Sequence, residues 1–190
     1  TENCFRMRYG RTDVWSQIQS RLADAGALKV ATTSMALTVN ETTDLPIAQL
    51  PMAREITFVG TNLLKQTAHV GAGVLALRLR PEPIPWARGV HKIIGYPTYT
   101  VPVMSTIAPL QAKAREKEYY FDPAAFAVQM APGDLIVIGP DRYTGERQTL
   151  GGLFFCKPEG TLFFNPSKRT PPQVKPAVRL YILICTAIND

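Results

Sequence analysis

The sequence predicts a mainly β protein built as an antiparallel sandwich or barrel of about eight short strands. Turn residues separate many short apolar runs along the chain, and these runs show no regular alternation of strand and helix patterns. Residues 74–80 alternate with a period of two, so that Leu75, Leu77 and Leu79 share one face of a strand. Because parallel strands need long, usually helical, crossovers, an antiparallel sheet is favoured over a parallel one.

The C-terminal region carries the strongest β signal, and we place the core there. Residues 135–138 form an apolar run after a Gly-Asp turn, and residues 153–164 predict a hairpin of two aromatic strands around a Pro-Glu turn. Residues 177–188 are apolar on both parities and rich in β-branched side chains, which predicts a strand covered on both faces. Ile182 and Ile184 are therefore expected in the core.

Length and composition predict one domain with an ample core. The chain has 190 residues, of which 46% are hydrophobic. No apolar run approaches the ~18 residues of a membrane span, and no signal peptide is visible, so we expect a soluble protein. The three cysteines have no CxxC spacing, which predicts buried thiols in a reducing compartment. The net charge of +6 suits contact with a polyanion.

A short basic segment precedes the main domain. Residues 1–11 carry Arg6, Arg8 and Arg11, and we interpret this segment as an N-terminal arm followed by a single domain over residues 12–190. An arm of this kind is either a loosely ordered terminus or a contact for phosphates or a partner chain. The three arginines are the candidate residues for nucleic-acid contact.

One amphipathic helix is predicted over residues 13–25. Val14, Ile18 and Leu22 recur at a spacing of four, and Gly26 ends the pattern. We expect the apolar stripe of this helix to pack on the core, because its polar side is not basic enough for a membrane-surface anchor.

The middle of the chain contains further strand and loop signals. Residues 28–39 and 55–59 predict strands, whereas the proline-punctuated residues 81–109 predict an irregular excursion with short edge strands. An Asp-Pro pair starts a predicted helix over residues 122–130. Residues 165–176 predict a long basic loop of the kind that makes contacts.

Four basic residues are candidates for a subunit interface. Arg78 and Arg80 lie on the strand face opposite the three leucines, which is a solvent or partner face. Lys168 and Arg169 lie in the long basic loop.

The sequence contains no recognisable catalytic constellation. His69 and His91 do not lie at a metal-ligand spacing from a Cys, Asp or Glu, and no nucleotide-binding or hydrolase motif is present. We therefore expect a protein that is not an enzyme and that holds no cofactor and no metal. A dyad of Cys156 with His91 stays open as an alternative, although a lone cysteine in an apolar strand pattern is more often a packing residue.

The outline of the chain resembles the single jelly-roll coat proteins of small icosahedral viruses. The shared features are a basic N-terminal arm, about eight short strands, proline-rich loops, helical excursions and a long apolar last strand, here residues 178–188. The resemblance lies in architecture and composition, and the chain lacks the long Arg/Lys-rich arm of many such proteins. It implies a jelly-roll-like structural protein that assembles with copies of itself or related subunits into a shell, contacts genomic nucleic acid through its arm and is located in the virion.

Two other functions remain as alternatives. One is a β-sandwich binding module, in the cytoplasm, that recognises a glycan, a nucleic acid or a protein without assembling. The other is an enzyme on a β-barrel or sandwich. A very large, closed and regular particle distinguishes the coat protein from the binding module, for which a monomer or dimer is expected.

Overall fold

The computed structural model describes residues 3–102, 107, 109, 114, 116–143, 149–157, 162–163, 173–174 and 176–188. It is mainly β with antiparallel sheets, which confirms the predicted class. The strands are β1 (Phe5–Arg11), β2 (Thr43–Leu50), β3 (Arg54–Val59), β4 (Lys65–Val70), β5 (Gly73–Pro83), β6 (His91–Thr100), β7 (Tyr119–Tyr120), β8 (Phe126–Met130), β9 (Asp134–Pro140), β10 (Leu162–Phe163), β11 (Gln173–Val174) and β12 (Tyr181–Ile184). The helices are α1 (Trp15–Asp24) and α3 (Leu150–Phe155), with 3-10 turns η1 (Thr12–Val14) and η2 (Asp122–Ala124). These strands outnumber the eight predicted.

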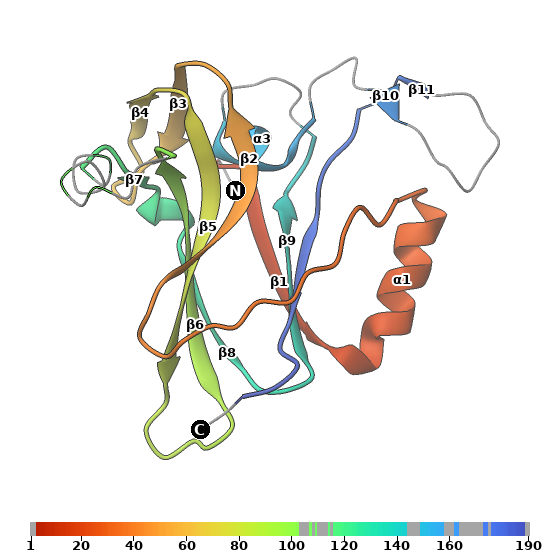
Figure 1. Cartoon of the computed structure of the whole chain (residues 1–190). Helices are drawn as coiled ribbons and strands as arrows, with labels where there is room; N and C mark the ends of the chain where they lie inside the picture. The colour runs from red at the N-terminus through yellow and green to blue at the C-terminus, as the bar shows by residue number, and fades with distance from the viewer. Residues whose placement is uncertain are drawn as a thin grey trace.

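Two sheets lie on either side of the molecule in Figure 1. In one sheet the order is β2-β5-β6-β7, with β8 also paired to β6, and in the other it is β1-β9-β12. The β3-β4 and β10-β11 pairs are separate two-stranded sheets. Every strand pair is antiparallel, as expected for strands joined by turns.

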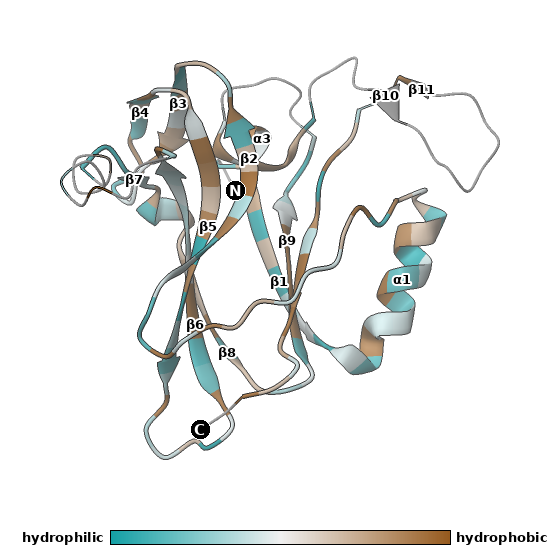
Figure 2. Ribbon diagram, viewed as in Figure 1, coloured by the Kyte–Doolittle hydropathy of each residue, from teal (hydrophilic) through white to brown (hydrophobic). Residues whose placement is uncertain are grey.

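The two main sheets share one hydrophobic core. Leu75, Leu77 and Leu79 of β5 are almost completely buried and belong to the same cluster as Ile136 and Ile138 of β9. The brown segments of β5 and β9 in Figure 2 mark these two contributions. The period-two alternation of residues 74–80 is thus confirmed, and it places the opposite parity of β5 on the outer face.

The most buried strand of the C-terminal region is β9 and not the last strand. β9 lies between β1 and β12, and its Leu135, Ile136 and Ile138 are at most 1% exposed. β12 pairs with β9 on one side only, and Ile184 is 39% exposed. The expectation of a last strand covered on both faces is therefore wrong. An apolar run on both parities also fits an edge strand whose outer face is apolar.

The predicted hairpin over residues 153–164 is wrong in its first half, because α3 occupies residues 150–155. Thr149 caps this helix, with its Oγ1 accepting a hydrogen bond of 3.2 Å from the amide of Gly152. Leu150 and Phe154 are one turn apart and both are buried. The helical spacing of large apolar residues thus prevails over the β propensity of the aromatics. The turn residues 158–161 lie outside the described residues.

Residues 28–39 contain no strand, contrary to prediction. They run as an exposed, irregular segment between α1 and β2, and of their side chains Leu37 packs against the core. Ala31 and Thr33 share the parity of Leu37 but are small or polar. Met35 and Val39, of the same parity, remain 38% and 37% exposed. The segment therefore buries too little apolar surface to fix a strand. The predicted helix over residues 122–130 is also wrong beyond its first turn, since η2 leads directly into β8.

The proline-rich excursion instead forms the longest hairpin of the fold. β5 continues through Pro81 and Pro83, and β6 follows it back in register. Pro97 is tolerated inside β6 because it falls between the residues that pair with β8 (91–95) and those that pair with β7 (98–99).

Residues 5–11, predicted as part of a basic arm, form strand β1. β1 pairs with β9 over its whole length, from Phe5 opposite Pro140 to Arg11 opposite Asp134. Phe5 is buried against Phe154 and Phe155, with ring centroids 6.1 and 5.0 Å away. The segment is anchored by this aromatic contact and does not project as a loose arm.

Candidate association surface

Helix α1 is amphipathic, yet none of its ten residues is buried. The predicted helix is confirmed, and its apolar stripe consists of Ile18 and Leu22 of α1 with Val14 of η1. These three residues are half-buried and lie outside the described core cluster, whereas the stripe was expected to pack on the core. Figure 1 shows α1 beside the β1-β9-β12 sheet, held by chain segments at its two ends. An isolated helix of this length is marginally stable in water, so most of its stability has to come from packing of its apolar stripe.

The ends of α1 are well defined. The amide of Thr12 donates to the carbonyl of Gly133 at 2.8 Å, which ties the start of the helical segment to the turn before β9. Gly26 ends the helix with φ of +69°, a left-handed conformation that glycine adopts without strain. The helix is therefore a fixed feature of the fold whose apolar stripe is only partly covered.

The second apolar surface is the outer face of β9 and β12. Ile136 and Ile138 belong to the core, so Leu135 and Val137 share the opposite parity of β9, and the register places Ile184 and Ile182 beside them. Leu135 is covered, at 1% exposure, and the exposed part of this face lies over the other three residues and Leu180. We call Val137, Leu180, Ile182 and Ile184 the outer sheet face. Leu180 and Ile184 are 44% and 39% exposed, and Val137 and Ile182 are half-buried.

Gly139 lets this face extend toward β1. A Cβ at Gly139 would overlap the end of the Leu180 side chain, so the absence of a side chain at Gly139 leaves room for Leu180 in its present position over β9. The result is a continuous aliphatic surface on the same side of the sheet as Arg6 and Arg8, which lie opposite Gly139 and Val137.

The three N-terminal arginines predicted to contact nucleic acid have different surroundings. Arg6 forms an ion pair of 2.5 Å with Asp141, and Arg8 and Arg11 are exposed. Arg6 and Arg8 share the outer parity of β1, whereas Arg11 ends the strand. The strand therefore holds two of the three cations on one face, beside the outer sheet face.

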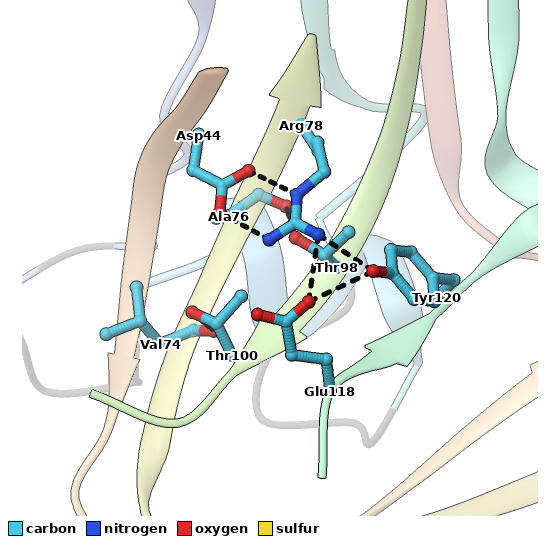
Figure 3. Close-up of polar contacts among 8 residues, drawn as sticks. All are labelled: Asp44, Val74, Ala76, Arg78, Thr98, Thr100, Glu118 and Tyr120. Atoms are coloured by element: carbon cyan, nitrogen blue, oxygen red, sulfur yellow. Dashed lines mark hydrogen bonds and ion pairs between the residues drawn. The ribbon is translucent and has the colours of Figure 1, made fainter. Parts of the chain in front are cut away.

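Arg78 is held by groups of its own chain on the outer face of the larger sheet (Figure 3). Its Nε and one terminal nitrogen donate to the two carboxylate oxygens of Asp44, both at 2.6 Å. The other terminal nitrogen donates to Glu118 Oε2 and to the hydroxyl of Tyr120, both at 2.8 Å. The hydrogen bonds that Arg78 donates to Asp44, and then those that it donates to Glu118, outweigh partial burial and raise the pKa of Arg78. This cluster joins β2 and β5 to the segment before β7.

The other candidate interface residues are less tightly organised. Arg80 pairs with Glu82 at 2.5 Å, and Glu82 also lies 3.5 Å from Lys92. The Nε of Arg80 is buried and has no hydrogen-bond partner among the described residues. Lys168 and Arg169 lie outside the described residues.

No group of three or more His, Cys, Asp or Glu side chains among the described residues is arranged to hold a metal ion. Cys156 forms an isolated antiparallel β-bridge with Val178 beside α3, whereas His91 pairs with Met130 in the larger sheet. The described strand pairings therefore place the two residues of the alternative dyad in different parts of the β structure. No described helix is long and apolar enough to span a membrane.

Sequence reasoning missed the two features that distinguish this surface. The outer parity of β12 was assigned to the interior, and α1 was expected to be covered by the core. The signal that was available is the apolar character of both parities in residues 177–188, because such a strand needs a cover on each face.

Comparisons of this chain with protein-family models, with curated proteins and with solved structures find no match.

Proposed function

We propose that this protein is a structural coat subunit on a jelly-roll-like sandwich framework, which assembles with copies of itself into a closed icosahedral shell around nucleic acid. The observation that carries the proposal is the pair of incompletely covered apolar surfaces on one chain, namely the α1 stripe and the outer sheet face. Contiguous exposed apolar surface on a folded domain marks an association site.

The two surfaces are suited to each other. The α1 stripe presents the half-buried aliphatic side chains of Val14, Ile18 and Leu22, and the outer sheet face presents aliphatic side chains of β9 and β12 with Leu180 beside them. Packing a helix stripe on a sheet face is the ordinary way in which both bury their apolar sides. A second copy of the chain supplies the missing half of each pair.

The magnitude favours assembly through several contacts and not one tight dimer. Full burial of a Val, Leu or Ile side chain contributes about 1.5–3 kcal/mol, and these side chains are already partly covered. Association costs on the order of 4–15 kcal/mol in lost freedom of motion, so one such contact is weak. In a closed shell each subunit makes several contacts at once, and their combined effect greatly exceeds each one alone.

The nucleic-acid part of the proposal is supported by the basic residues of β1. Arg8 and Arg11 are exposed, and the formal net charge of the chain is +6. Fixed cations on a strand bind phosphates without reading base sequence, which is what packaging of a genome requires.

The proposal is tested by the mass of the wild-type protein as its concentration is raised, measured by light scattering after size-exclusion chromatography and followed by negative-stain microscopy. We expect large particles of uniform size that dissociate on dilution. A protein that stays monomeric or dimeric at every concentration and salt would contradict the coat function and favour the binding module.

A further inference from the structure

The hairpin between β5 and β6 ends in an unusual turn. The amide of Ala87 donates to the carbonyl of Ile84 at 3.1 Å, which closes a β-turn with Pro85 and Trp86 at its two central positions. Trp86 has φ of +70°, a left-handed conformation that Gly or Asn usually supplies at this position. Its side chain is completely exposed to solvent.

Both properties of Trp86 are unfavourable in an isolated chain. A left-handed backbone is disfavoured for a bulky L-residue, and an exposed indole leaves a large apolar surface in water. Glycine would fit this turn better than tryptophan. The presence of tryptophan here therefore points to a contact of its indole outside its own chain. Tryptophan is also among the residues most enriched at the energetic centres of protein interfaces.

The opposite end of the molecule contains a matching cavity. It has a volume of about 320 Å³ and is lined on one side by Thr57, Phe58 and Val59 of β3 and on the other by Asn3 and Thr149. Lys65 and Leu63 complete its lining. Leu63 is exposed, and it too is held at positive φ, by the turn between β3 and β4.

The walls of this cavity are fixed by hydrogen bonds. The Asn3 side chain pairs with the backbone of Val59, donating from Nδ2 to its carbonyl at 3.0 Å and accepting from its amide at 2.6 Å. Thr57 and Thr149 form a parallel β-bridge. A cavity with such walls needs little reorganisation to accept a rigid side chain, which favours binding.

The contents of the cavity suit an indole. Val59 and Leu63 line the cavity with aliphatic groups, and the Lys65 ammonium suits a cation–π contact with an inserted indole. The ring of Phe58 faces the core, where it packs on Phe121, so Phe58 forms the buried floor of the cavity's lining strand. A volume of about 320 Å³ lies within the range of sites that accept small aromatic groups.

The positions of the two features show that a second copy is needed. Figure 1 places the β5–β6 turn at the bottom of the molecule and the β3-β4 pair at the top. The eleven residues of β5 span about 36 Å between these ends, at ~3.3 Å per residue. Trp86 therefore does not reach the cavity of its own chain.

We infer that Trp86 of one copy inserts into the cavity lined by Phe58, Leu63 and Lys65 of the next copy, which gives a head-to-tail contact between subunits. This inference rests on the proposed function, because it names one of the contacts by which the subunits assemble. A head-to-tail contact is heterologous, and such contacts close into rings when the rotation between copies permits.

Tryptophan fluorescence tests the inference directly. The chain contains two tryptophans, so a Trp15→Phe variant reports Trp86 alone. We expect its emission to shift to the blue and its quenching by iodide to fall as particles form. Particles in which iodide quenches Trp86 as strongly as in the monomer would overturn this inference and leave the proposed function standing. A chain that never associates would overturn both, and a shift that needs added anionic phospholipid vesicles would assign Trp86 to a membrane contact.

Substitution at the turn separates binding from folding. Trp86→Gly removes the indole and relieves the left-handed strain, so the monomer should melt at the same or a higher temperature. Association should nevertheless require at least about tenfold more protein, as for loss of an interface hot spot. Val30→Gly, at another highly exposed apolar residue, is the control and should leave association unchanged. Equal association of Trp86→Gly and wild type would overturn the inference.

Cross-linking locates the contact. Ala87→Cys on one copy and Leu63→Cys on another should form a disulfide-linked heterodimer when the two variants are mixed and oxidised. Val30→Cys in place of Leu63→Cys should not. Equal cross-linking of both pairs would overturn the assignment of this cavity.

Discussion

Arg78 and Asp44 face each other across β5 and β2 as a bidentate pair, with both donor–acceptor distances at 2.6 Å. The two residues are directly opposite in the strand register, and the Arg78 side chain is only 13% exposed. The same guanidinium also contacts Glu118 and Tyr120, so one residue links three segments of the chain. Such geometry is typical of structural arginines.

Replacing Arg78 should therefore destabilise the monomer. We expect Arg78→Met to lower the free energy of unfolding by about 1–3 kcal/mol, because it leaves Asp44 and Glu118 without their charged partner. Arg80→Met should cost less, since the Arg80 side chain is 40% exposed. Urea titration measures both variants. Because the pKa of Arg78 is raised, its contribution to the free energy of unfolding is lost only when the pH exceeds the ordinary pKa range of arginine. The difference in stability between wild type and Arg78→Met should therefore persist in mild alkali. Equal effects of the two substitutions would contradict this account.

Introducing a charge should prevent folding at Ile136 of β9 but not at Ile184 of β12. Ile136→Asp places a carboxylate at a completely buried position of β9 and should abolish folding. Ile184→Asp lies on an edge strand at 39% exposure and should leave a folded monomer, contrary to what a buried last strand would predict. Circular dichroism with thermal melting distinguishes the outcomes, and an unfolded Ile184→Asp protein would restore the sequence prediction.

Gly151 should tolerate no side chain. A Cβ at this position would overlap the carbonyl of Cys4, and Gly151 itself donates its amide to the carbonyl of Asn3 at 2.9 Å. We expect Gly151→Ala to lower the melting temperature sharply by pushing the N-terminal strand away from α3. Gly10→Ala is the matched control, because its Cβ would meet its nearest neighbour at an ordinary 3.5 Å. Similar melting of the two variants would show that the contact with Cys4 is not tight.

The basic residues of β1 should contribute to binding of nucleic acid by charge alone. Replacing Arg8 and Arg11 by Gln should weaken binding and reduce its salt slope by about 0.7–0.9 log units per lost phosphate contact. Adding Arg6→Gln should change the slope less, because Arg6 is already paired with Asp141. Filter binding measures the slope, with Lys29→Gln and Arg54→Gln together as a control that removes equal charge elsewhere. No binding even at low salt would remove nucleic acid from the proposal.

Strand β5 and helix α1 were predicted well, because in each the apolar residues repeat with the period of the element along one face. The alternation of Leu75, Leu77 and Leu79 located β5, and the four-residue spacing from Val14 to Leu22 located α1. In both cases the periodicity of the backbone determines which side chains share a face.

The surfaces against which these elements pack could not be predicted in the same way. The stripe of α1 indicates that the helix needs a cover, but not whether its own core or another chain supplies it. Likewise, the apolar outer parity of residues 177–188 predicts a covered strand and does not identify the cover. The short α3 was missed because Thr149, its capping residue, was not weighed against the aromatic run that follows.

The most direct test of the central claim is the mass of particles formed by charge variants of α1. Ile18→Asp with Leu22→Asp places two carboxylates in the apolar stripe, whereas Ser16→Asp with Ser20→Asp places two carboxylates at the same spacing on the exposed side. Sedimentation velocity at matched concentrations should show a folded monomer for the first pair and wild-type particles for the second. Particles of wild-type size from both pairs would contradict the claim that the α1 stripe holds the shell together.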